Sequence, residues 1–191
     1  MSAKILAFAG SARRDSFNKK LLNIAVAGAE RAGASVTTID LADYPMPLYD
    51  GDLEADGGVP ENARSLRGLM LEHNAFLIAA PEYNSGITPL LKNTIDWTSR
   101  PDGDVAQLAA YGGKVAALVA ASPGALGGLR GLFHVRYVLS NIRVTVLPEQ
   151  ASVPQAGGAF NEAGELTDDA RRQQVEAVGS ALAKAAAKLH G

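Results

Sequence analysis

The chain has 191 residues, 47% hydrophobic and 20% charged, which is typical of one globular domain with a sizeable core. Its net charge of -2 lacks the basic excess of a nucleic-acid binder, and the absence of cysteine excludes disulfides, thiolate nucleophiles and thiolate metal sites. No apolar run approaches the roughly 18 residues of a membrane span, so we expect no membrane partner. The short apolar run at residues 5–9 indicates a first strand instead of a signal peptide, and we expect a cytoplasmic protein.

The first predicted strand is the apolar run at residues 4–10. A helix is predicted over residues 16–32, because apolar residues recur there at three- and four-residue spacing. Ser16 can cap the start of this helix, and Gly33 can close its end. A second strand follows at residues 35–41.

A proline-rich loop at residues 44–47 leads into a polar stretch that extends to about residue 60. The next helix is predicted over residues 60–73, and the third strand over residues 75–80. Thr88 and Pro89 then open another helix, since Thr is a capping residue and Pro is favoured at the first helical position.

The last third of the chain repeats this alternation. The fourth strand is predicted at residues 114–121, followed by a helix over 126–140 and a fifth strand at 143–147. A loop containing Gly157 and Gly158 precedes the final helix, residues 168–189, with Thr167 as its cap.

These elements predict the α/β class with one domain over residues 1–191. Strict β-α alternation indicates a doubly wound five-stranded parallel sheet with right-handed crossovers, in three α/β/α layers. Continuously apolar strands are typical of a sheet covered on both faces. Ligands of such sheets bind beyond the carboxyl ends of the strands, so the loops after the first, third and fourth strands are the candidate site.

The loop after the first strand, residues 10–18, combines hydroxyl and amide side chains, Arg13, Arg14 and a helix N-terminus. These are the parts of a phosphate site, because backbone N–H groups, the helix dipole and a guanidinium all favour an anion. No G-x-G-x-x-G or Walker motif occurs, so an ordinary NAD site and a P-loop ATPase are disfavoured. The alternative interpretation is a capped turn whose polar residues satisfy only the backbone.

The other two loops are also rich in turn-forming and small residues. After the third strand, residues 81–97 give a proline-rigidified turn against which a flat amphipathic ring could lie, or simply a well-capped loop with Trp97 in the core. After the fourth strand, residues 121–130 contain glycines that let the backbone approach a ligand. Ser122 is the best ligand candidate there, whereas Gly127 and Gly128 could equally serve helix packing.

Together the three loops resemble the motifs of the NADPH-dependent FMN reductase family. Residues 10–18 are similar to its Gly-Ser-x-Arg-x-x-Ser-x-Asn signature, and residues 81–84 to its Pro-Glu-Tyr-Asn loop. Residues 91–97 match its Leu-Lys-Asn-x-Ile-Asp-Trp helix, and residues 122–130 its Ser-x-Gly-x-x-Gly-Gly-x-Arg segment. One departure is that Ser85-Gly86 and Thr88-Pro89 stand where family members often have a small residue plus Ser, then Pro-Gly. The resemblance implies a flavodoxin-like fold that binds FMN.

The resemblance also assigns roles to residues of this chain. The phosphate of FMN would contact the first loop, with the Arg14–Phe17 backbone wrapping it. The isoalloxazine ring would lie on the second loop, bordered by the third. The implied phosphate residues are Ser11, Arg13, Ser16, Phe17 and Asn18, and the implied ring residues are Glu82, Tyr83, Asn84, Ser85 and Ser122. No catalytic residue and no metal ligand is implied, and the three scattered histidines lack metal-site spacing.

The function implied is an FMN-dependent NAD(P)H oxidoreductase. Two electrons would pass from the nicotinamide through FMN to a quinone, free flavin, azo compound or metal oxyanion in a ping-pong mechanism. From their positions in the chain, we expect Tyr83 to shape the flavin face and Arg100 to attract the dinucleotide phosphate. Family members usually form dimers or tetramers, so the resemblance implies a homodimer or homotetramer. The alternatives are an electron-carrier flavodoxin, which is usually more acidic than this chain, and an FMN- or phosphate-binding sensor.

Overall fold

Five parallel strands form the central sheet of the computed structural model, which describes residues 2–190. The strand order is β2-β1-β3-β6-β7, the flavodoxin-like order of doubly wound folds, so the predicted fold class is confirmed. Two further short strands pair antiparallel in a separate hairpin. The sheet strands are β1 Lys4–Ala9, β2 Ser35–Asp40, β3 Ala75–Ala79, β6 Val115–Ala121 and β7 Thr145–Val153, and the hairpin strands are β4 Glu82–Tyr83 and β5 Gly86–Ile87.

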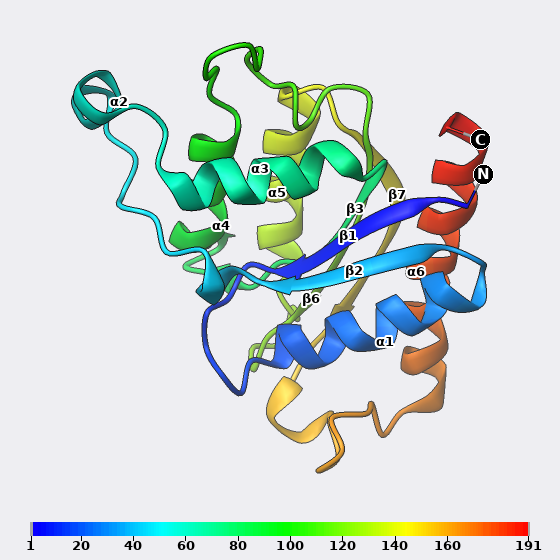
Figure 1. Cartoon of the computed structure of the whole chain (residues 1–191). Coiled ribbons are helices and arrows are strands. Elements are labelled where there is room, and N and C mark those ends of the chain that lie inside the picture. Colours follow the sequence, from blue (N-terminus) through cyan, green and yellow to red (C-terminus); the bar gives the residue numbers. More distant parts are fainter. Residues whose placement is uncertain (1, 191) are drawn as a thin grey trace.

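Helices cover both faces of the sheet and complete three layers (Figure 1). Helices α1 and α6 pack on one face, and α3, α4 and α5 on the other. The short helix α2 projects from one end of the molecule and contains no buried residue. The helices are α1 Phe17–Arg31, α2 Gly51–Gly57, α3 Glu61–Glu72, α4 Pro89–Thr98, α5 Leu129–Asn141 and α6 Asp169–His190, with 3-10 turns at Leu41–Asp43 and Ala156–Gly158.

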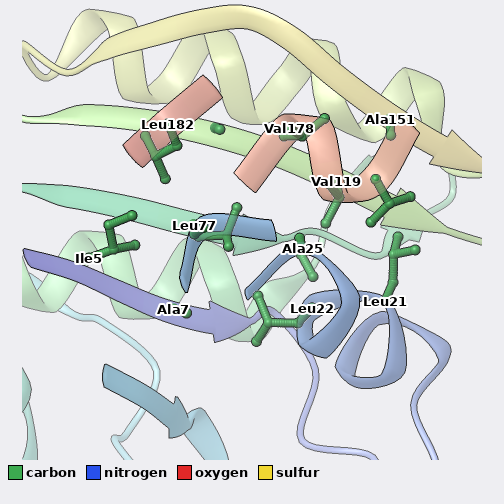
Figure 2. Close-up of a cluster of buried hydrophobic side chains, with 14 of the residues drawn as sticks. Ile5, Ala7, Leu21, Leu22, Ala25, Leu77, Val119, Ala151, Val178 and Leu182 are labelled. Carbon is green, nitrogen blue, oxygen red and sulfur yellow. The ribbon is translucent and has the colours of Figure 1, made fainter. Parts of the chain in front are cut away.

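The three central strands carry the core. Ile5, Leu77 and Val119 point toward α1 and α6, as Figure 2 shows, and all three are fully buried. The alternate residues of the same strands face α3, α4 and α5 in a second cluster. Burial of each such side chain stabilises the fold by about 1.5–3 kcal/mol. The sequence predicts strands that are covered on both faces, but the edge strands β2 and β7 are partly exposed. Each of them has only one neighbouring strand, so its outer side is open.

Helices α1 and α6 touch through their backbones at two glycines. A Cβ atom on Gly28 would lie 2.0 Å from the Glu176 carbonyl oxygen, and one on Gly179 would lie 1.9 Å from the Ala25 carbonyl oxygen. No side chain fits at either position without moving the helices apart. This contact fixes α1, and therefore its N-terminus, relative to the sheet.

Several predicted boundaries are wrong for local reasons. Helix α5 begins at Leu129 instead of residue 126, because Gly127 and Gly128 adopt left-handed conformations with φ of +61° and +90°. Strand β7 runs past Pro148, which the sheet accommodates by a shift in register against β6. The cap of α6 is Asp168, not Thr167: its Oδ1 accepts from the N–H groups of Ala170 and Arg171 at 3.0 and 3.2 Å. The Ser16 cap and the left-handed Gly33 after α1 are confirmed.

Helix α2 lies in the polar stretch for which no element was predicted. Asp50 caps it by accepting from the Asp52 N–H at 2.8 Å. The preceding proline-rich loop is held against α4, since Asn93 accepts from the Tyr49 N–H at 2.8 Å and Trp97 Nε1 donates to the Pro47 carbonyl at 2.8 Å. Asn93 therefore has a structural role, because it holds this loop against the helix.

Candidate functional site

The loops after β1, β3 and β6 meet at one cavity of about 270 Å³. These three strands are adjacent in the sheet, so their carboxyl ends present the loops side by side, as predicted. The first loop gives most of the polar lining, the second lies at the mouth and the third completes one wall. The lining residues are Ser11, Arg13, Ser16, Phe17, Asn18, Pro81, Glu82, Tyr83, Ala121, Ser122 and Pro123.

The first loop presents hydrogen-bond donors without partners. Ser11 Oγ accepts from the Arg13 N–H at 3.3 Å, and Ser16 Oγ accepts from the Asn18 N–H at 3.3 Å, which fixes the loop and the start of α1. Among residues 2–190, no acceptor pairs with the backbone N–H groups of Ala12, Arg14, Asp15 and Phe17. With the positive end of the α1 dipole, these donors form a cradle for an anion.

Arg13 adds a full positive charge to this cradle. Its guanidinium carbon lies 5.2 Å from the centre of the Phe17 ring, a cation–π distance. Within the described part of the chain, Arg13 forms no ion pair with any carboxylate. An exposed guanidinium without a carboxylate partner remains able to bind a phosphate.

Asn18 connects the first and third loops. Its Nδ2 donates to the Ala121 carbonyl at 2.8 Å, and its Oδ1 accepts from the Ala121 N–H at 2.9 Å. The side chain is 4% exposed, so both bonds are shielded from water. Asn18 thus ties the start of α1 to the end of β6 and fixes the two walls relative to each other.

Glu82 anchors the β4–β5 hairpin to α5. Its carboxylate accepts from Arg130 Nη2 at 2.8 Å and from the Gly131 N–H at 3.0 Å. Burial raises the pKa of Glu82, but the Gly131 N–H and the Arg130 guanidinium outweigh it, and the pKa lies below its ordinary value of 4.5. The carboxylate is therefore ionised at neutral pH.

Asn84 and Ser85 form the turn of the same hairpin. Their φ angles of +49° and +67° are left-handed, as the two central residues of a type I′ turn require. Neither residue lines the cavity, whereas Tyr83 lies at its mouth and is 54% exposed. The hairpin was not predicted, because two-residue strands carry no recognisable sequence pattern.

The third loop is a closely packed wall. Ser122 lines the cavity, and its Oγ accepts from the Gly124 N–H at 3.2 Å. A Cβ on Gly127 would lie 2.6 Å from the Pro154 nitrogen, and one on Gly128 would lie 2.8 Å from the Ala120 Cβ. Both glycines therefore permit close packing.

Arg100 lies away from the cavity, at the end of α4 opposite the helix N-terminus. Its Nε donates to Glu54 Oε1 at 2.8 Å, and its guanidinium lies 5.5 Å from the centre of the Tyr49 ring. It is not among the residues that line the cavity of its own chain.

Two kinds of feature are absent from residues 2–190. No group of three or more His, Asp or Glu side chains there could hold a metal ion. In the same residues, no helix is long and apolar enough to cross a membrane.

Known structures resemble the fold over nearly its whole length. The flavoenzyme NAD(P)H:(acceptor) oxidoreductase FerB of Paracoccus denitrificans superposes with a TM-score of 0.80 at 27% identity, covering 97% of this chain and 98% of that one. A flavodoxin from the domain Archaea gives a TM-score of 0.63 at 12% identity, over 96% of this chain and 99% of that one, and supports the fold alone.

The sequence comparisons agree with the three loop motifs. An NAD(P)H:quinone oxidoreductase of Solanum tuberosum is 35% identical over 193 residues, covering 98% of this chain and 95% of the relative. An NAD(P)H-dependent FMN reductase of Pseudomonas aeruginosa is 34% identical over 189 residues, covering 98% and 97%. Residues 3–158 match the model of one family, and the chain belongs to that family, the NADPH-dependent FMN reductases, whose oxidoreductase class, FMN and nicotinamide donor are those predicted from the loops.

Proposed function

We propose that this chain holds FMN in the cavity between the β1, β3 and β6 loops and reduces a quinone with NAD(P)H. The observation that carries the proposal is the anion cradle of the first loop, where Arg13, unpaired backbone donors and the α1 N-terminus adjoin an open mouth. The name of the potato relative, an NAD(P)H:quinone oxidoreductase, supports the quinone acceptor, and the name of the Pseudomonas aeruginosa relative, an NAD(P)H-dependent FMN reductase, supports the nicotinamide donor and the flavin.

The first loop fits the phosphate of FMN. A phosphate monoester needs several donors and a compensating charge, which the backbone of residues 12–17 and the Arg13 guanidinium supply. The Ser11 and Ser16 hydroxyls line the cavity and complete the donor set. We propose that Asn18 contributes mainly by position, because both ends of its amide bind Ala121.

The hairpin and the third loop would hold the isoalloxazine ring. The cavity of about 270 Å³ lies just below the range of about 300–1,000 Å³ usual for ligand pockets, so part of FMN would extend through the open mouth. Tyr83 and the backbone of Asn84 and Ser85 would border one edge of the ring, with Glu82 fixing the hairpin. Ser122 would border the opposite wall.

The chemistry belongs to the cofactor, and the protein binds and orients it. When bound, FMN accepts two electrons from a nicotinamide and delivers them to an oxidised acceptor. No side chain of the cavity is required as an acid or base for this, so we assign no catalytic residue. Because the hairpin covers one side of the mouth, donor and acceptor would use the same open face in turn, which gives ping-pong kinetics.

We also propose that the protein is a homodimer or homotetramer. Phe133 and Tyr137 are 54% and 75% exposed, and their spacing puts them on the same side of α5. Helix α5 also packs against the β4–β5 hairpin, so an interface on α5 would lie on an element that adjoins the second loop of the cavity. Sedimentation of a monomer at micromolar concentration would contradict this. A cytoplasmic location, where NAD(P)H is supplied, stays a prediction.

The test is a steady-state assay of the FMN-loaded protein. NADH and NADPH are each supplied with a panel of acceptors: a benzoquinone, free FMN, an azo dye and chromate. We expect dinucleotide oxidation with the quinone and parallel lines in double-reciprocal plots. Tight FMN binding with no oxidation of either dinucleotide would favour the electron-carrier alternative, and intersecting lines would exclude the shared face.

A further inference from the structure

Phe160, which lies beyond the residues matched by the family model, reaches the phosphate loop. Its ring stacks on Phe17 with the ring centres 6.0 Å apart and the planes 8° from parallel. Phe17 in turn carries the guanidinium of Arg13 at 5.2 Å. Three side chains from two distant segments thus form a continuous contact that ends at the unpaired charge of the anion cradle.

The segment that carries Phe160 is a tightly bonded turn. The Asn161 N–H donates to the Glu165 carbonyl at 2.9 Å, and the Glu165 N–H donates to Asn161 Oδ1 at 2.9 Å. Phe160 pairs with Leu166 across this turn, and Leu166 is buried in the core beside α1 and α6. The Phe160 ring is therefore held by a rigid part of the fold.

Arg13 has few other restraints. Its side chain is exposed and forms no ion pair within residues 2–190. A free arginine loses rotamer freedom when it binds a phosphate, and that loss weakens binding. A side chain already ordered over a fixed ring loses less, so the stack favours the bound arrangement.

We propose that Phe160 is a positioning residue for the cofactor phosphate, acting through Phe17 on Arg13. The inference rests on the proposed binding of FMN in this cavity. Phe160 would not touch FMN itself. Its role is to hold the Phe17 ring in the plane on which the Arg13 guanidinium lies.

The test compares Phe160→Leu, which keeps an apolar side chain without a ring, with Phe160→Tyr, which keeps the ring. Affinities for FMN and for riboflavin, which lacks the phosphate, are measured by quenching of flavin fluorescence. We expect Phe160→Leu to weaken FMN binding about three- to tenfold, the range for losing order in one side chain, and to leave riboflavin binding unchanged. Phe160→Tyr should bind both ligands as the wild type does.

A double-mutant cycle with Arg13→Ala tests whether Phe160 affects FMN binding through Arg13. If Phe160 acts through Arg13, Phe160→Leu causes no further loss of FMN affinity when Arg13 is already alanine. Equal weakening of FMN and riboflavin, an unchanged FMN affinity, or a full loss in the Arg13→Ala background would each overturn the inference. A wild-type protein that fails to bind FMN would overturn the proposed function itself, which separates the two failures.

Discussion

The loops that follow β1 and β3 line the same cavity but use their polar groups in different ways. In the β1 loop, the N–H groups of Ala12 and Arg14 have no acceptor among residues 2–190, and Arg13 has no carboxylate partner there. In the β3 loop, the carboxylate of Glu82 is already bound by Arg130 and by the Gly131 N–H. The polar groups of the β1 loop are therefore free to bind a ligand, whereas the carboxylate in the β3 loop is already bonded and fixes the position of that loop.

The two loops therefore have different roles, ligand binding and support of the hairpin, which a match to family motifs does not distinguish. Both loops resemble motifs of the family, and both are expected to contact the cofactor. The geometry supports direct phosphate binding by the first loop, because unmet hydrogen-bonding groups at a helix N-terminus attract an anion. The side chain of Glu82 instead holds the hairpin, so its effect on a ligand would be indirect.

The largest effect on FMN binding should follow from removing the unpaired charge of Arg13. Arg13→Ala loses a charge-assisted bond to the phosphate, and we expect FMN binding to weaken by about 1.5–3 kcal/mol, with the fold intact. Arg14→Ala is the matched control, since Arg14 is also exposed in the same loop but does not line the cavity. Titration of flavin fluorescence measures both. A larger loss in Arg14→Ala would move the phosphate contact to that residue.

Asn18→Ala should affect the fold as well as the ligand. It leaves the N–H and carbonyl of Ala121 without partners in a buried place, where each unmet group costs about 1–3 kcal/mol. We expect a comparable drop in the free energy of unfolding, measured with urea in the absence of flavin. Asn18→Asp keeps the acceptor for the Ala121 N–H and should not restore the wild-type value, because it cannot donate to the carbonyl. Wild-type stability in Asn18→Ala would show that the link is unimportant.

Glu82→Gln should have a smaller effect. Glutamine retains an acceptor for the Gly131 N–H but loses the ion pair with Arg130, whose side chain is 55% exposed. Solvent screening limits such a pair, and we expect a loss of about 1 kcal/mol or less in the free energy of unfolding. Arg130→Gln should give a similar loss, and the double variant little more. Full additivity of the two losses would mean that the residues act separately.

The smallest effect is the pH dependence of the same contact. The pKa of Glu82 in the folded protein lies below its ordinary value of 4.5, so its stabilisation is present above that value and is lost as the pH falls below it. The difference in unfolding free energy between wild type and Glu82→Gln should therefore shrink on acidification. A difference that is constant from neutral to acid pH would contradict the depressed pKa.

Much of the fold was predictable because its signals are local. Apolar runs such as residues 75–80 and the caps at Ser16 and Thr88 indicate their elements directly. Helix α2 was not predictable, since residues 51–57 are mostly acidic or glycine and bury nothing. The end of β7 was misjudged because Pro148 usually stops a strand, and only the register shift against β6 allows it to continue.

The location of the candidate site was predictable from the sequence, but the contacts within it were not. Strand order brings the three loops together, which alternation of elements already implied. That Asn18 binds the backbone of Ala121 depends on a partner 103 residues away, and no spacing rule indicates it. The individual FMN contacts and the single domain over residues 1–191 stay predictions, which the binding measurements above and limited proteolysis would check.

The N-cap of helix α5 is Gly128, a residue with no side chain to cap the helix, and Glu82 from the hairpin accepts the N–H of Gly131 in the first turn. Because the hairpin supplies the cap of α5, the first turn of α5 cannot fray without breaking this contact with the hairpin. Amide hydrogen exchange at Gly131 should therefore report opening of residues 82–87, and it should accelerate in Glu82→Ala while the amides of α1 remain protected. The mouth of the cavity and the first turn of α5 would then open as one cooperative unit.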